Sequence, residues 1–162
     1  MKTRYLTLFI ALFSISVFAQ DVNMQNGTIT QCSGNLFDSG GPSANYGNDE
    51  NFILTICSPT PGEVIQLNFL SFSTQINLDI LTIYDGDSTA APIIGNFSGG
   101  GASANPNFIT ASTSNPTGCL TLEFISDGSA NTTGFEAEIS CFEPCQTITA
   151  VLDSTSPAYD TT

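Results

Sequence analysis

The chain has 162 residues and is strongly acidic, with fifteen Asp and Glu residues, only two basic residues and no His. Both basic residues, Lys2 and Arg4, lie in the first four positions, so residues 20–162 carry every carboxylate and no basic side chain. This charge disfavours nucleic acid and anionic membrane surfaces as partners and favours cations. The lack of His, and of Lys after position 2, also excludes the usual catalytic triads and Schiff-base chemistry.

The first nineteen residues have the pattern of a secretory signal peptide. Lys2 and Arg4 form a short basic region, residues 5–18 are largely apolar, and Val17-Phe18-Ala19 resembles a cleavage site. The apolar run is shorter than the roughly 20 residues that a membrane-spanning helix needs. We therefore expect a secreted or cell-surface protein without membrane insertion, with residues 20–31 forming an N-terminal lead-in.

The central part of the chain alternates between apolar and polar residues, as β-strands with one buried face do. Alternation predicts strands at residues 64–72, 120–124 and 135–141, and the more uniformly apolar runs at residues 52–56 and 80–84 suit central strands. Turn sequences such as Asp85-Gly86-Asp87 and Gly99-Gly100-Gly101 separate them. Short strands separated by such turn sequences favour an all-β fold, an antiparallel two-sheet β-sandwich. Glu136 and Glu138 form a carboxylate pair, but side by side on a solvent-facing strand they favour a solubilising role. We therefore expect no enzymatic activity.

Alternation stops at Cys141, and a Thr- and Ser-rich stretch follows. Residues 142–162 are interpreted as a linker or as the start of a following module, so other domains of the same chain are expected partners. Five cysteines in an exported chain indicate disulfides.

Four segments occur in order within residues 32–141. They are the glycine-rich turn Asp38-Ser39-Gly40-Gly41-Pro42 leading to Tyr46, the strand 67–72, the segment Asp79-Ile80-Leu81-Thr82-Ile83-Tyr84-Asp85-Gly86, and the segment 120–129 followed by Gly134-Phe135-Glu136-Ala137. Together they resemble a CUB domain, an extracellular jelly-roll-like β-sandwich. The common Trp after the first Tyr is missing. The chain is similar to the variant found in bacterial secreted multidomain proteins.

The resemblance also implies a calcium site at one end of the sandwich. It places ligands on Asp79 and Asp127, a bracing role on Tyr46, and backbone carbonyl ligands on Gly128 or Ser129. Gln75 falls where the family has Glu, which removes one charge from a site of hard oxygens, and Asn77 is a further candidate oxygen donor. The alternative is that Asp79 and Asp127 only cap turns.

For the disulfides, the resemblance implies the pairs Cys32–Cys57 and Cys119–Cys141. Cys145 is then left over, and it is expected to pair beyond this sequence, with a local pair to Cys141 as the alternative. The pair Cys119–Cys141 conflicts with the alternation, which places Cys119 on the face of Thr121 and Cys141 on the face of Ile139. A bulge near residues 116–118 would reconcile them.

The resemblance thus implies a non-catalytic extracellular module for calcium-dependent protein–protein interaction, with an acidic surface suited to a basic side chain of the partner. A carbohydrate-binding accessory module of a secreted hydrolase is the second hypothesis. It is disfavoured because the chain has no Trp to form a sugar platform and few Tyr. A structural spacer in an adhesin, without a ligand, is the third.

Overall fold

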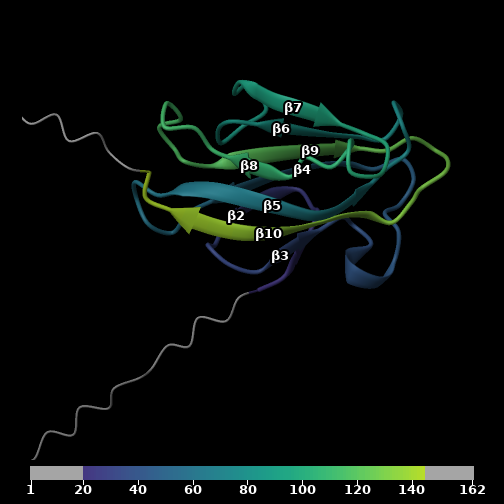
Figure 1. Cartoon of the computed structure of the whole chain (residues 1–162), viewed down its shortest axis with the longest axis horizontal. Coiled ribbons are helices and arrows are strands. Elements are labelled where there is room, and N and C mark those ends of the chain that lie inside the picture. The colour runs from purple at the N-terminus through teal and green to yellow at the C-terminus, as the bar shows by residue number, and fades with distance from the viewer. Residues whose placement is uncertain (1–19, 145–162) are drawn as a thin grey trace, which may run out of the picture.

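The computed structural model describes residues 20–144 as two β-sheets packed face to face (Figure 1). The expected signal peptide, Cys145 and most of the expected linker lie outside these residues. Within them, no helix is long and apolar enough to cross a membrane. The elements are β1 (Val22–Asn23), β2 (Gly27–Thr30), β3 (Asn35–Phe37), the 3₁₀ turn η1 (Gly41–Ser43), β4 (Asn51–Cys57), β5 (Val64–Ser73), β6 (Ile80–Tyr84), β7 (Ile93–Phe97), β8 (Phe108–Thr110), β9 (Leu120–Ile125) and β10 (Gly134–Phe142).

Each sheet has five strands. The first, called sheet A, has the order β1-β3-β10-β5-β8, and the second, sheet B, has the order β2-β4-β9-β6-β7. The expected all-β two-sheet sandwich is confirmed. Its pairings are antiparallel except at the N-terminal edges, where β1 lies parallel to β3 and β2 parallel to β4. Residues 20–31, expected as a lead-in, carry these two edge strands and thereby add one strand to each sheet.

The core lies between the sheets and consists of the inward-facing residues of the alternating strands. A group of phenylalanine rings joins the two layers: Phe135 of β10 meets Phe124 of β9 edge-on at 5.6 Å and stacks on Phe72 of β5 at 6.2 Å. The largest fully buried side chains are Tyr46, Phe124, Phe135, Leu36, Leu54, Ile56, Ile65, Leu67, Leu81, Ile83, Leu120 and Leu122. Burial of these apolar side chains supplies the main driving force for folding.

The four cysteines of residues 20–144 form two disulfides, but the expected pairs are wrong. The structure joins Cys32 to Cys141 and Cys57 to Cys119. The second pair follows from strand register, because Ile56 of β4 lies opposite Leu120 of β9 and the next residues outward are the two cysteines. Cys57 and Cys119 therefore share one face, and no bulge is needed. The two disulfides span 109 and 62 residues of chain.

We predict that non-reducing digestion after glutamate residues will link the fragment 51–63 to the fragment 64–123, and the Cys32 fragment to the fragment that begins at residue 139, since the Glu143–Pro144 bond resists cleavage. Mass spectrometry of the digest checks this, and a link between the Cys32 fragment and 51–63 would contradict it.

Replacing both Cys57 and Cys119 by Ser is expected to cost about 2–5 kcal/mol of unfolding free energy in a urea titration, since the cross-link restricts the unfolded chain.

Candidate functional site

Three loops meet at one end of the sandwich, on the right in Figure 1, where β9 ends and β10 begins. They are residues 44–50 before β4, residues 74–79 between β5 and β6, and residues 126–133 between β9 and β10. This region is called the loop end below. It contains every residue that the sequence suggested for a calcium site, although these residues are far apart along the chain.

The Asp79 carboxylate is the centre of the loop end. It is completely buried, and each of its oxygens accepts one hydrogen bond. The Tyr46 hydroxyl donates to Oδ2 at 2.5 Å, and the backbone N–H of Asp127 donates to Oδ1 at 2.8 Å. One side chain therefore joins all three loops, and the bracing role expected of Tyr46 is visible as a direct hydrogen bond.

Tyr46 itself is held rigidly. Its ring is buried and packs edge-on against Phe124 at 5.0 Å, and its hydroxyl also accepts the backbone N–H of Gln75 at 3.1 Å. Burial, followed by the hydrogen bond to Asp79, raises the pKa of the Tyr46 hydroxyl above its usual value of 10. The hydroxyl thus remains a donor to Asp79 over the physiological pH range.

Gln75 makes the second set of contacts. Its carboxamide nitrogen donates to the Ser129 carbonyl at 2.8 Å and to Asp127 Oδ1 at 3.1 Å, an orientation assigned from the hydrogen-bond network. Asp127 Oδ1 also accepts the Ser129 N–H at 2.8 Å and the Ser129 hydroxyl at 3.1 Å, so Asp127 caps its own turn. Both expected roles of Asp127, in the site and in the turn, are therefore compatible with the geometry.

Asparagines that the sequence reasoning missed connect the first and third loops. Asn48 donates to the Gly128 carbonyl at 3.1 Å, Asn131 donates to Asn48 Oδ1 at 3.2 Å, and Asn45 donates to the Asn131 carbonyl at 3.3 Å. Gly128, expected as a carbonyl ligand, thus has its carbonyl bonded to Asn48. The only sequence signal was the density of Asn in both loops, which is also typical of ordinary turns.

The backbone of the loop end is unusual. Four non-glycine residues of the described chain have φ near +60°, and three of them, Asp49, Asn77 and Ala130, lie one in each loop. Such conformations cost free energy and tend to gather at functional sites. Ala130 is the most informative of the three, because Asp and Asn tolerate this region better than Ala.

A buried carboxyl lies beside the loop end. Asp38 is almost completely buried and accepts the backbone N–H groups of Gly40 at 2.7 Å and Phe135 at 3.1 Å. Burial is the main cause that raises its pKa from 3.8 to about 6; the two hydrogen bonds oppose the rise and the neighbouring Glu50 carboxylate adds to it. The Glu50 carboxylate in turn accepts hydrogen bonds from the Ser39 hydroxyl and the Gly47 N–H.

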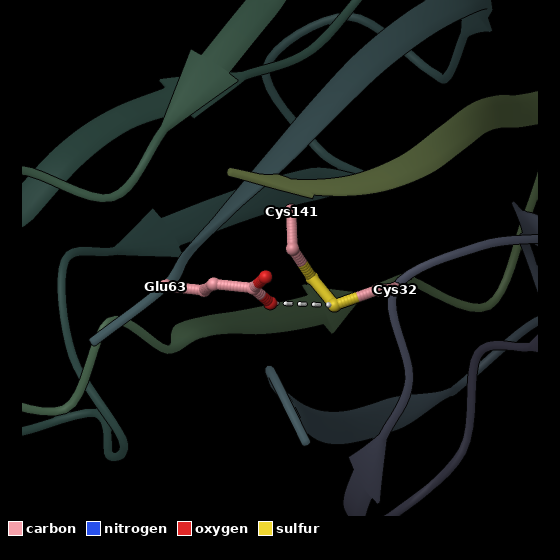
Figure 2. Close-up of side chains that lie close together, drawn as sticks. All are labelled: Cys32, Glu63 and Cys141. Atoms are coloured by element: carbon pink, nitrogen blue, oxygen red, sulfur yellow. Dashed lines mark hydrogen bonds between the residues drawn. A yellow bond between two sulfur atoms is a disulfide. The ribbon is translucent and has the colours of Figure 1, made fainter. Parts of the chain in front are cut away.

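A second cluster with metal-ligand side chains lies at the other end of β10 (Figure 2). It consists of Cys32, Glu63 and Cys141, and it is the one such group of His, Cys, Asp and Glu within residues 20–144. Its two sulfurs form a disulfide, so neither is a thiolate, and the Ser58 hydroxyl donates to Glu63 at 2.6 Å. Its chemistry is that of a structural cross-link rather than of a metal site.

Comparison with known proteins identifies the family. The CUB domain family matches residues 25–139, and a segment of mouse multiple epidermal growth factor-like domains protein 8 is 34% identical over 124 residues. Dog cubilin is 37% identical over 98 residues. The aligned segments cover 76% and 58% of this chain but only 4% and 2% of those proteins. The chain therefore belongs to the CUB domain family, whose members are generally non-catalytic modules of extracellular proteins.

Solved structures support the fold. The extracellular region of zebrafish Gpr126/Adgrg6 aligns over 75% of this chain and 15% of its own, with a TM-score of 0.60 at 19% identity. The MASP-1 CUB2 domain bound to Ca²⁺ aligns over 72% of this chain and 98% of its own, with a TM-score of 0.54 at 18% identity. At these identities the likeness concerns the sandwich fold alone.

The residues of the loop end fit a calcium ion in their chemistry. The Gln75 carboxamide lies within about 3 Å of Asp127 Oδ1 and the Ser129 carbonyl. When the amide turns over, three oxygens converge, as a hard cation requires. With the nitrogen facing inward, the same three groups satisfy one another without a cation. A Glu at this position would instead place a second carboxylate beside Asp127.

The first prediction for this site concerns Gln75→Glu. The change removes two donated hydrogen bonds and places a carboxylate against Asp127, so we expect a loss of about 1–3 kcal/mol of unfolding free energy in EDTA. Calcium should restore the stability of this variant and shift its melting temperature more than that of the wild type. Gln25→Glu adds the same charge at an exposed position and serves as the control. Equal stability of Gln75→Glu and wild type in EDTA would contradict the hydrogen bonds assigned to Gln75.

The second prediction concerns pH. The folded chain keeps a proton on Asp38 up to about pH 6, whereas the unfolded chain releases it near pH 3.8. The stabilisation is therefore complete below pH 3.8 and is lost as the pH rises through 6. Urea unfolding should show about 1 kcal/mol more stability at pH 5 than at pH 7. Because the chain has no His, few other groups titrate in this window. Asp38→Asn should remove the difference in stability between pH 5 and pH 7. If the difference persists in that variant, another group causes it.

Proposed function

We propose that this domain is a non-catalytic, extracellular protein-interaction module and that the loop end is its binding surface. The observation that carries the proposal is the convergence of three loops on the buried Asp79 carboxylate. A surface fixed in this way can present a constant shape to a partner without paying an ordering cost on binding.

The composition of the loop end supports a basic partner. Asp49, Glu50 and Asp127 bring negative charge to it, and residues 20–162 contain no basic side chain to neutralise that charge. Two exposed apolar side chains, Ile76 and Leu78, lie on the same loop as Gln75. Apolar contacts beside acidic groups suit a lysine or arginine side chain of the partner together with its aliphatic stem.

Calcium is the proposed cofactor of this surface. Asp79, Asp127, Gln75 and the Ser129 carbonyl would hold it, with the Gly128 carbonyl as a further oxygen and Tyr46 as the brace. When bound, the ion would supply positive charge that balances the two carboxylates and orders the loops. Because Gln75 contributes no charge, the affinity is expected at the weak extracellular end, roughly 10⁻⁴ to 10⁻³ M.

Titration calorimetry and thermal melts with calcium test this part of the proposal. At 5 mM calcium the wild type should melt about 3–14 °C higher than in EDTA, because binding to the folded state alone stabilises it by about 1–2 kcal/mol over the expected affinity range. Asp79→Ala and Asp127→Ala should abolish the shift. Asp87→Ala removes an exposed carboxylate in the β6–β7 loop and should retain it. Asp127→Ala leaves the backbone N–H that Asp79 accepts, so it remains informative if Asp79→Ala does not fold. No heat and no shift in the wild type would exclude calcium.

The basic partner can be tested with a lysine side-chain analogue. N-acetyl-lysine methylamide should shift the backbone NMR signals of residues 45–50, 75–79 and 126–131 when calcium is present, and it should shift them less in Asp127→Ala. The norleucine analogue, which lacks the charge, is the matched control. Shifts spread evenly over the acidic surface would argue against a specific site at the loop end.

A further inference from the structure

The outer face of sheet A carries a shallow groove that the loop end does not use. The groove has a volume of about 400 Å³, within the range of small-ligand sites. Its lining comes from four neighbouring strands, β3, β10, β5 and β8, and from Gly34 just before β3. Three of these strands, β5, β10 and β3, lie in the lower half of the sandwich in Figure 1.

A row of side chains crosses the groove from strand to strand. Phe108 pairs with Asn68, Asn68 with Glu138, and Glu138 with Asn35, so the four residues are direct cross-strand neighbours. With strands about 4.8 Å apart, the row is roughly 14 Å long. A second row, Thr110, Gln66 and Ser140, runs beside it two residues further along the strands.

The polar groups of the groove are held in place by one another. Asn68 donates to Glu138 at 3.0 Å and Gln66 donates to Thr110 at 3.0 Å. Within residues 20–144 the side-chain carbonyl oxygens of Asn68 and Gln66 accept no hydrogen bond from protein. The face therefore offers preorganised acceptors together with hydroxyl groups, at a fixed spacing.

One end of the first row is an exposed aromatic ring. Phe108 lies on the short edge strand β8 with 66% of its surface exposed, although covering a ring of this size would be favourable. The sequence reasoning counted only Trp and Tyr as sugar platforms and therefore overlooked this residue. The flat face of a phenyl ring can equally pack against the C–H face of a pyranose.

We propose that this groove binds a neutral oligosaccharide. Amide, hydroxyl and carboxylate groups at strand spacing match the alternating donors and acceptors of sugar hydroxyls, and Phe108 supplies the apolar contact. No basic side chain lines the groove, and Glu138 adds a negative charge, so sulfated and uronate-rich glycans are excluded as ligands. This binding is independent of the loop end and of calcium.

Binding to insoluble polysaccharides tests the proposal with the full chain. Cellulose, chitin and mannan serve as neutral probes, and heparin and polygalacturonate immobilised on beads serve as anionic ones. We expect retention on at least one neutral polysaccharide in EDTA and on neither anionic one. Phe108→Ala and Asn68→Ala should each reduce retention at least tenfold. Ile93→Ala removes a similarly exposed side chain from sheet B and should leave it unchanged. Thermal melts check that each variant folds.

The alternative occupant is a second copy of the chain pairing through the edge strand β8. A concentration-dependent dimer in light scattering that Phe108→Ala dissociates, without any retention on neutral polysaccharide, would assign the face to self-association and overturn the proposal. Retention that persists in both Phe108→Ala and Asn68→Ala, retention on the anionic probes alone, or no retention at all would overturn it as well. Retention by Asp127→Ala equal to the wild type would separate this groove from the loop end.

Discussion

The structure depends on one electrostatic constraint: residues 20–162 hold fifteen carboxylates and no basic side chain, so no carboxylate can form a salt bridge with another side chain of these residues. Neutral donors satisfy them instead. Tyr46 and a backbone N–H serve Asp79, backbone N–H groups serve Asp38, and Tyr84 donates to Glu123 at 2.6 Å. A neutral donor gives less than a cation would, and a buried carboxylate needs its donors in fixed positions. The hydrogen bonds that satisfy these carboxylates therefore also hold the loops in place.

The same constraint has different results at the two ends of the sandwich. At the β6–β7 end, burial alone would raise the pKa of Asp85, but hydrogen bonds from Ser112 and Asn115 lower it below its usual value. Near the loop end, burial and the proximity of Glu50 prevail over the hydrogen bonds to Asp38 and raise its pKa to about 6. The balance between burial and the hydrogen bonds donated to a carboxyl therefore decides the direction in which its pKa moves.

The sequence predicted β4, β5, β6, β9 and β10 correctly for two reasons: half-buried strands alternate, as β5, β9 and β10 do, and the central strands β4 and β6 are more uniformly apolar. Strands such as β1 and β8 are too short to alternate detectably. The expected disulfide pairs were wrong. The alternation already argued against joining Cys119 to Cys141, since it placed the two residues on different faces. The resemblance indicated that the expected calcium ligands would lie close together, and the structure shows the contacts among Tyr46, Asp79 and Asp127. No sequence pattern could show the direction of the Gln75 amide or the Asn48–Asn131 bridge, which depend on the packing of distant loops.

The place of β10 has a consequence for how the domain is made. β10 is the last strand of the described chain, yet it lies in the interior of sheet A, between β3 and β5. A chain that emerges with its N-terminus first must therefore wait for residues 134–142 before β3 and β5 have a common neighbour. Until then both carry unpaired edges that invite aggregation. Folding should be a single late event of high contact order, completed only when the last strand is available.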